Sequence, residues 1–173
     1  MKHLERGALF ALFVAASVAA LGQAAGKADE SYARSIEQWR AEREAKLKAD
    51  DGWLTVAGLY WLEPGENRAG ADADAKIALP ENSAPRNFGT FTLNGEQTTF
   101  EPAPGVVVAV NGEILKGKRV LQWDPMDEHQ DKLSHGDLTM FVIKRGERFA
   151  IRLRDKNSLM RREFTGLHWY PVN

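Results

Sequence analysis

The sequence contains no cysteine among its 173 residues. This absence excludes disulfide bonds, a thiolate nucleophile and thiolate metal ligands, and it also excludes a lipoprotein anchored through cysteine. If the chain is exported, its stability must therefore come from its hydrophobic core alone.

A strong excess of charge of one sign is also absent. The chain has 23 Lys and Arg residues against 24 Asp and Glu residues, which gives a formal net charge of −1. A nearly balanced chain is a poor candidate for binding nucleic acid or anionic lipid, so we expect neither partner.

Long apolar runs are absent except near the N-terminus. Lys2 and Arg6 form a basic head, residues 8–21 carry no charge, and small residues follow at Gly22-Gln23-Ala24. This pattern predicts a secretory signal peptide over residues 1–24, cleaved after Ala24 or one residue later, and hence a periplasmic or secreted protein. A membrane anchor is the alternative, but the run is shorter than the roughly 20 residues that span a bilayer. We therefore expect no stable membrane span after cleavage.

Removal of the leader leaves about 149 of the 173 residues, and it lowers the basic count from 23 to 21 and the acidic count from 24 to 23. The remaining chain has the length of one ordinary domain and a charge of about −2.

Residues 25–52 predict an amphipathic helix. Asp29-Glu30-Ser31 offers capping side chains, and apolar residues recur at helical spacings at Tyr32, Ile36, Trp39 and Leu47. Charged residues fill the positions between them, so the apolar stripe is thin. We expect the stripe to pack across the domain's own sheet, and binding of a partner protein is the alternative.

Residues 53–173 predict a β-rich domain. Turn signals at Asn94-Gly95, Asn111-Gly112 and 144–147 each predict a hairpin. The aromatic segment 53–62 is predicted to be a buried strand, and the loop 66–76 is expected to be exposed. We expect about nine strands, which begin at Trp53, Lys76, Phe88, Gln97, Gly105, Glu113, Arg119, Leu138 and Arg148. The predicted fold is mainly β, a β-sandwich or partly open barrel with one N-terminal amphipathic helix.

Several separated motifs between Tyr32 and Asn173 occur in the order found in one bacterial family. They are Gly52–Leu62, Gly65-Glu-Asn67, Leu79-Pro80, Gly89–Thr92, Val110-Asn-Gly112, Ile151–Asp155 and Phe164-Thr-Gly166. On these motifs the chain resembles domain-of-unknown-function family 1684. The resemblance implies no reaction, cofactor or catalytic residue. Members of that family continue past the equivalent of His168–Pro171 into a second β-rich half, so the resemblance implies a short or truncated member.

A second set of turns is similar to turns in another known group of proteins. The order of Gly65–Gly70, Ile77–Pro80 and Val108–Gly112 is similar to the order of turns in phosphopeptide-binding forkhead-associated β-sandwiches. No Arg follows Gly70 and no Ser-x-x-His follows Leu79, so the phosphate-reading pattern departs from theirs. We use this likeness to support a sandwich and not to predict phosphothreonine binding.

One acidic loop could carry chemistry. Residues 124–131, with His135 and Asp137 close behind, concentrate carboxylates and imidazoles that could hold calcium or zinc, but their spacing matches no standard metal-binding template. A solvated loop is the simpler interpretation, so we predict no metal and no cofactor. Ser134, His135 and Asp137 resemble a triad in composition only, because neighbouring residues of an extended segment point to opposite faces.

Two clusters are candidate binding surfaces. Arg152 and Arg154 share one strand face, with Asp155, Arg161 and Arg162 nearby, and could clamp an anion or could simply form surface ion pairs. Aromatic residues at Tyr60 and Trp61, beside Asn67, could stack on a flat ligand or could pack in the core. The segment 168–170 admits the same two interpretations.

These observations predict an exported β-rich protein that binds a small ligand or an envelope partner. The candidate binding residues are Trp61, Asn67, Arg152 and Asp155. One alternative is an envelope hydrolase, metal-dependent in one version, that uses the loop 124–137. The other is a structural half-domain of a truncated family member. The sequence leaves open whether the protein is an enzyme.

Overall fold

The computed structural model describes residues 30–123 and 130–172. The predicted signal peptide and most of the acidic loop lie outside these residues. The described chain divides into two compact units, one formed by Leu47–Thr165 and the other by the residues up to Lys46 together with Gly166–Asn173.

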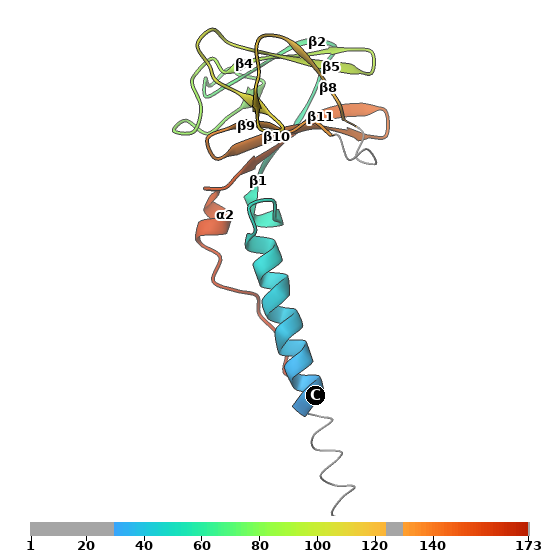
Figure 1. Ribbon diagram of the computed structural model, residues 1–173, viewed down its shortest axis with the longest axis vertical. Coiled ribbons are helices and arrows are strands. Elements are labelled where there is room, and N and C mark those ends of the chain that lie inside the picture. Colours follow the sequence, from blue (N-terminus) through green and yellow to red (C-terminus); the bar gives the residue numbers. More distant parts are fainter. Residues whose placement is uncertain (1–29, 124–129, 173) are drawn as a thin grey trace, which may run out of the picture. The chain divides into compact units, whose positions relative to one another are not determined.

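The regular secondary structure of the Leu47–Thr165 unit is mainly β-strand, joined by turns and loops (Figure 1). A single turn of 3₁₀ helix, η1 (Trp53–Thr55), precedes the first strand, and a short helix, α2 (Leu159–Arg162), follows the last. The strands are β1 (Val56–Trp61), β2 (Gly65–Gly70), β3 (Ile77–Ala78), β4 (Gly89–Asn94), β5 (Gln97–Pro102), β6 (Ala109–Val110), β7 (Glu113–Ile114), β8 (Arg119–Leu121), β9 (Leu133–His135), β10 (Leu138–Arg145) and β11 (Arg148–Asp155).

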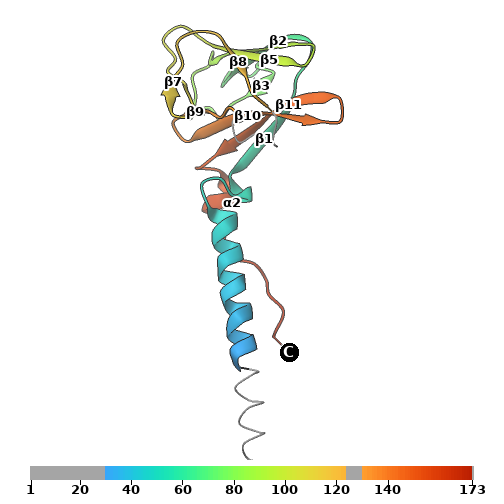
Figure 2. The ribbon, with the colours of Figure 1, turned by 45° about the vertical axis from the view of Figure 1, so that its right-hand side comes forward.

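The strands form two sheets that face each other (Figures 1 and 2). Sheet A has the order β1-β11-β10-β9-β6-β7, and sheet B has the order β3-β2-β4-β5-β8. All neighbouring strands are antiparallel except β2 and β3, which run parallel. The predicted mainly β fold with a sandwich architecture is confirmed, and the described residues contain eleven strands rather than about nine.

The core lies between the two sheets and follows from alternation along the strands. Alternate residues of β10 (Leu138, Met140 and Val142) and of β11 (Phe149, Ile151 and Leu153) are buried, and sheet B contributes a cluster of phenylalanines. The ring centroid of Phe100 lies 4.6 Å from that of Phe91 and 5.6 Å from that of Phe88. Phenylalanines and aliphatic residues therefore fill the core, and tryptophans do not.

The three predicted hairpins are confirmed, because each depends on a local turn signal. β4 pairs with β5, β6 with β7, and β10 with β11, each across a two-residue loop. In the β6–β7 loop, Asn111 and Gly112 have φ values of 50° and 88°. These are the left-handed conformations that a type I′ turn requires.

Three local predictions are wrong. The expected loop 66–76 contains most of β2, which pairs with β4, and β9 was not expected at all. The segment 53–62 is not a buried strand, because its first three residues form η1 and Trp53 is 70% exposed. In this segment the apolar residues that reach the core are Leu54 and Leu62.

The other unit consists of helical residues up to Lys46 and the segment that begins at Gly166. The rings of Trp39 and Trp169 meet edge to face with centroids 5.5 Å apart. The Glu44 carboxylate accepts hydrogen bonds from the Trp169 indole N–H at 2.8 Å and from the backbone N–H of Leu167 at 2.9 Å. The predicted helix is thus confirmed over its described residues, and its central tryptophan packs against the C-terminal segment.

No helix among residues 30–123 and 130–172 is long and apolar enough to cross a membrane.

Candidate functional site

The outer face of sheet A carries a row of arginine and aromatic side chains. Core residues Ile151 and Leu153 of β11 point inward, so Arg152 and Arg154 project from the opposite face. The strand register places Arg152 between Leu59 of β1 and Phe141 of β10. We call this surface the arginine face and define it by Trp53, Leu59, Trp61, Phe141, Arg145, Arg148, Arg152 and Arg154.

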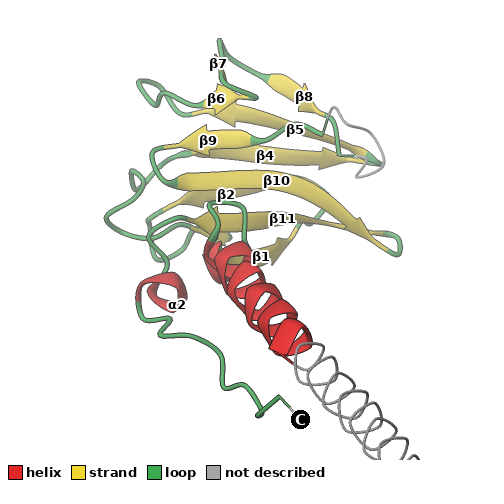
Figure 3. Cartoon of the chain, turned by 60° about the horizontal axis from the view of Figure 1, so that its bottom comes forward, coloured by secondary structure: helices red, strands yellow, loops and turns green. Residues whose placement is uncertain are grey.

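The length of the β10–β11 hairpin extends this surface, because both strands have eight residues and pair along their full length (Figure 3). Arg145 and Arg148 lie directly opposite each other at the hairpin end. The four arginines therefore follow two adjacent strands from the turn toward the other end of the sheet.

Three of the arginines stack on aromatic rings. The guanidinium carbon of Arg148 lies 4.2 Å from the centroid of a Trp61 ring. The corresponding distances are 5.4 Å for Arg154 over Phe141 and 5.9 Å for Arg152 over Trp53. Such cation–π contacts hold the planar guanidinium groups in place and are worth about 0.5–1 kcal/mol each at exposed sites.

The positive charge on this face has no partner among the described residues. Arg145, Arg148, Arg152 and Arg154 form no salt bridge within that part of the chain, and the Nε atoms of Arg152 and Arg154 are buried without a hydrogen-bond acceptor. Burial lowers the pKa of Arg152 below its usual value, and the like charges of Arg145 and Arg154 lower it further. An arginine remains protonated at neutral pH despite such a shift, so the face concentrates uncompensated charge.

A groove of about 430 Å³ lies at one end of this face. It is lined by Asp50, Asp51, Gln130, Lys132, Thr139, Phe141, Arg154 and Lys156. Asp50 is already engaged, because Lys156 approaches its carboxylate to 3.1 Å and Arg161 to 2.7 Å. The hydrogen bonds from Lys156 and Arg161 lower the pKa of Asp50, so it remains an anion.

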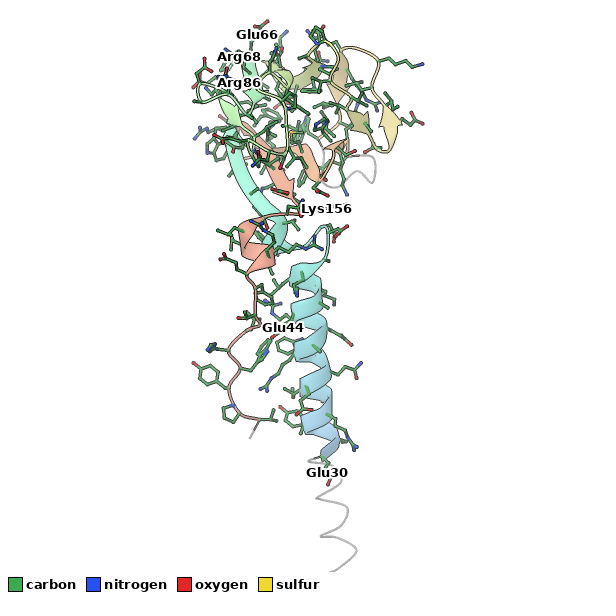
Figure 4. The ribbon with its side chains drawn as sticks, turned by 90° about the vertical axis from the view of Figure 1, so that its left-hand side faces the viewer. Glu30, Glu44, Glu66, Arg68, Arg86 and Lys156 are labelled. Atoms are coloured by element: carbon green, nitrogen blue, oxygen red, sulfur yellow. The ribbon has the colours of Figure 1, made fainter. Side chains whose placement is uncertain are left out.

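The outer face of sheet B has a different composition. A groove of about 330 Å³ there is lined by threonines, glutamates and prolines, with Lys118 as its cation. Cross-strand pairs on this face join Thr92 to Thr99 and Thr90 to Glu101. Figure 4 labels Glu66, Arg68 and Arg86 on this side of the unit and Lys156 on the opposite side.

The structure brings together two of the four predicted binding residues. Trp61 and Arg152 share the arginine face. Asn67 lies on β2 of sheet B and is 0% exposed, since its side chain accepts from the backbone N–H of Glu63 and donates to the backbone carbonyls of Glu63 and Gly65. Asp155 is 6% exposed and accepts a hydrogen bond from the backbone N–H of Asn157 at 2.8 Å.

The described part of the acidic segment serves a structural role. Asp131 is 2% exposed and accepts hydrogen bonds from Asn111, Arg119 and the backbone N–H of Gln122 at 2.9–3.0 Å. No group of three or more His, Asp or Glu side chains within residues 30–123 and 130–172 could hold a metal ion. Residues 124–129 lie outside the described chain.

The Ser134, His135 and Asp137 triad does not form. His135 places its Nδ1 atom 2.8 Å from the backbone carbonyl of Val107 and its ring 5.3 Å from that of Phe88. Ser134 is the neighbouring residue of the same strand and points to the other face.

The remaining candidates are held by local contacts. The guanidinium of Arg161 donates to the backbone carbonyls of Lys48 and Lys156 at 2.8 and 2.9 Å, in addition to the Asp50 ion pair. Trp169 packs within the other unit, where Tyr170 is 88% exposed. The predicted arginine cluster therefore separates into a structural residue, Arg161, and the pair on the arginine face.

Sequence reasoning missed Trp53, Leu59, Phe141, Arg145 and Arg148 as members of this face. Phe141 and Arg148 could have been found from strand alternation, which sets them on the same side as Arg152. Trp53 could not have been found in this way, because it precedes β1 and reaches Arg152 only through the conformation of η1.

Comparisons with known proteins give structural matches only. No family model matches the chain, and no curated protein does either, so the resemblance to family 1684 remains a prediction. One similar structure is the N-terminal FHA domain from EssC, a component of the bacterial Type VII secretion apparatus, with 16% identity and a TM-score of 0.43 over 58% of this chain and 46% of that chain. Another is the FHA-2 domain from the Mycobacterium tuberculosis ABC transporter Rv1747, with 24% identity and a TM-score of 0.38 over 53% of this chain and 77% of that chain.

Two further matches concern the interactions of FHA domains. The FhaA FHA domain was crystallised in complex with the intracellular domain of Rv3910, and it matches with 18% identity and a TM-score of 0.39 over 56% of this chain and 97% of that chain. Another similar structure comes from a structural and functional analysis of phosphothreonine-dependent FHA domain interactions. It also matches with 18% identity and a TM-score of 0.39, over 56% of this chain and 92% of that chain.

These matches contradict the predicted function. We expected an exported protein with a signal peptide, in the periplasm or secreted, that binds a small ligand or an envelope partner. The matched structures are FHA domains, and one of them was crystallised in complex with the intracellular domain of another protein. The predicted function and its hydrolase and half-domain alternatives are therefore corrected, and so is the description built on them. The matches do not locate the chain in the cell, so the periplasmic or secreted location stays a prediction.

Proposed function

We propose that this chain is a protein-interaction domain and that the arginine face is its binding surface. One observation carries the proposal: three arginines stack on aromatic rings of an open sheet, and they make no ion pair with the described residues. Aromatic residues and arginines are enriched where proteins bind one another, because they bury a large area and form directed hydrogen bonds.

The shape and composition of the surface agree with this function. The groove at one end of the arginine face is lined by charged and polar side chains with Phe141 as its one apolar residue, whereas sites for small molecules are lined mainly by apolar and aromatic side chains. Trp53 and Leu59 are 70% and 41% exposed, so large apolar groups remain available for a partner to cover.

Site-specific photocrosslinking tests the proposal. A photoreactive amino acid at Leu59 on the arginine face is expected to give a discrete protein adduct in the cells that produce the full chain. The matched control is the same amino acid at Thr99 on the outer face of sheet B, which should give no such adduct. Arg152→Ala should abolish the Leu59 adduct while the circular dichroism spectrum stays unchanged. Adducts of equal yield from both faces, or none from Leu59, would contradict the proposal.

A further inference from the structure

The arginine face presents its free donors at a regular spacing. Arg152 and Arg154 are two residues apart on β11, and side chains at this separation on one face of a strand lie roughly 6.6 Å apart. Because their Nε atoms are buried, the terminal nitrogens are the groups that a partner can reach. Each guanidinium can donate two parallel hydrogen bonds from its terminal nitrogens to one carboxylate.

The positions of these guanidinium groups are fixed before a partner binds. Phe141 supports Arg154 and Trp53 supports Arg152, so both planes are held by aromatic rings and not by a carboxylate of the same chain. A partner would therefore lose little side-chain entropy when it binds there, since the planar fork is already oriented.

The charged side chains around the arginine face favour a partner with negative charge. Arg145 and Arg148 extend the positive surface at one end, and Lys132 extends it at the groove. Asp50 and Asp51 also line that groove, and the carboxylate of Asp50 is neutralised by Lys156 and Arg161. Burial of Arg152 beside two like charges is costly until an anion approaches it.

From these observations we infer that the partner of the arginine face is an extended protein segment with a carboxylate at every second residue. An extended chain repeats its side chains at the same roughly 6.6 Å spacing, so successive Asp or Glu residues match Arg152 and Arg154. The residues between them can contact the exposed rings of the face. This inference rests on the proposed function and specifies the chemistry of the partner.

Fluorescence anisotropy with synthetic peptides and the full chain tests this inference. The probe is a labelled ten-residue peptide of alternating Glu and Thr, and the comparison peptides contain Gln in place of Glu or five Glu followed by five Thr. The alternating acidic peptide should bind with a Kd at least tenfold lower than either comparison peptide. Equal binding of the Gln peptide would overturn the carboxylate requirement, and equal binding of the block peptide would overturn the spacing.

Matched variants locate the binding. Arg152→Gln and Arg154→Gln should each weaken binding of the alternating acidic peptide by about tenfold, as expected for loss of a charge-assisted bidentate pair. The control Arg68→Gln removes an arginine of sheet B and should change the Kd by less than twofold. Arg152→Lys keeps the charge and should give an intermediate loss. Equal losses for Arg68→Gln and Arg152→Gln would overturn the site.

Two other classes of ligand test whether the arginine face prefers a different anion. Vesicles that contain phosphatidylserine, or a threonine-phosphorylated peptide without acidic residues, should bind more weakly than the alternating acidic peptide. Tighter binding of either would overturn the inference. A crosslink at Leu59 combined with no peptide binding would refute the partner chemistry alone, whereas loss of both would refute the proposed function as well.

Discussion

The arginines on the two outer faces of the sandwich differ in what their guanidinium groups contact. On the side of sheet B, Arg68 approaches Asp72 to 3.7 Å and Asp74 to 3.4 Å, and Arg86 approaches Asp72 to 2.7 Å (Figure 4). On the side of sheet A, Arg148, Arg152 and Arg154 rest on aromatic rings and pair with no described carboxylate. The arginines on the side of sheet B are therefore paired with carboxylates, whereas the described residues offer no carboxylate to those on the arginine face.

This difference indicates which face is suited to binding. Exposed ion pairs such as those of Arg68 contribute little to stability and already have a partner. An arginine that is partly buried without an acceptor costs stability, and such costs persist where a surface has a use other than folding. A comparison of the two faces thus separates an ordinary surface from a candidate interface.

The largest expected effect concerns the core that holds both faces in one unit. Phe100 is fully buried, and its ring contacts those of Phe88 and Phe91. Phe100→Ala should lower the free energy of unfolding by about 3–5 kcal/mol, because it removes a large apolar side chain and leaves a cavity. Urea denaturation followed by circular dichroism measures this change.

Val120→Ala on β8 provides the control for this prediction, since Val120 is 45% exposed and the change should cost at most about 0.5 kcal/mol. A loss below about 1 kcal/mol for Phe100→Ala would mean that the two sheets do not share the core described above. The comparison of their outer faces would then lack its basis.

The sequence predicts an element of the fold where neighbouring residues determine it. It does not predict an element that forms only through contacts with residues distant in the sequence. The β6–β7 turn depends on Asn111 and Gly112, which tolerate positive φ, and this signal is present in the sequence. β2 contains the residues Gly-Glu-Asn-Arg-Ala-Gly, which show no apolar alternation, and it is a strand because β4 pairs with it. Its Gly70 is required by packing, since a Cβ there would lie 1.9 Å from the backbone oxygen of Arg86.

The candidate site follows the same division. Alternation along β11 correctly placed Arg152 and Arg154 on one face. Asn67 looked like a surface residue at a turn, but its amide completes the hydrogen bonds of the turn from Glu63 to Asn67 and is buried. An aromatic pair such as Trp53 with Arg152 depends on three-dimensional neighbours that no sequence pattern specifies.

A substitution of Arg152 sharpens the comparison directly. Arg152→Met should raise the free energy of unfolding by about 0.5–1 kcal/mol, because it removes a buried, unpaired Nε–H group and its repulsion with Arg145 and Arg154. The matched variant Arg68→Met should change it by less than about 0.5 kcal/mol, since only exposed ion pairs are lost. Urea denaturation at neutral pH measures both changes. A decrease of more than about 1 kcal/mol for Arg152→Met would show that the arginine face is a structural feature.

The smallest expected effect is the pH dependence that the ion pair of Asp72 on the side of sheet B should contribute. The hydrogen bond from Arg86 is the largest cause that lowers the pKa of Asp72 below its usual value of 3.8. A carboxylate with a depressed pKa in the folded state stabilises the protein above its unfolded-state pKa, and this contribution is lost as the pH falls through the lower folded-state pKa. Stability should therefore decrease slightly below about pH 4 through Asp72, whereas the unpaired arginines of the other face add no such dependence.

Thermal unfolding between pH 2.5 and pH 5 tests this prediction with Asp72→Asn. The variant should lose part of the acid dependence of the chain, and its unfolding temperature should approach that of the parent as the pH falls and Asp72 becomes protonated in the folded state as well. Arg152→Gln serves as the comparison and should leave the shape of the acid profile unchanged. If Arg152→Gln flattened the profile as much as Asp72→Asn, a carboxylate would have to pair with Arg152. The statement that only the arginines on the side of sheet B are paired with carboxylates would then be wrong.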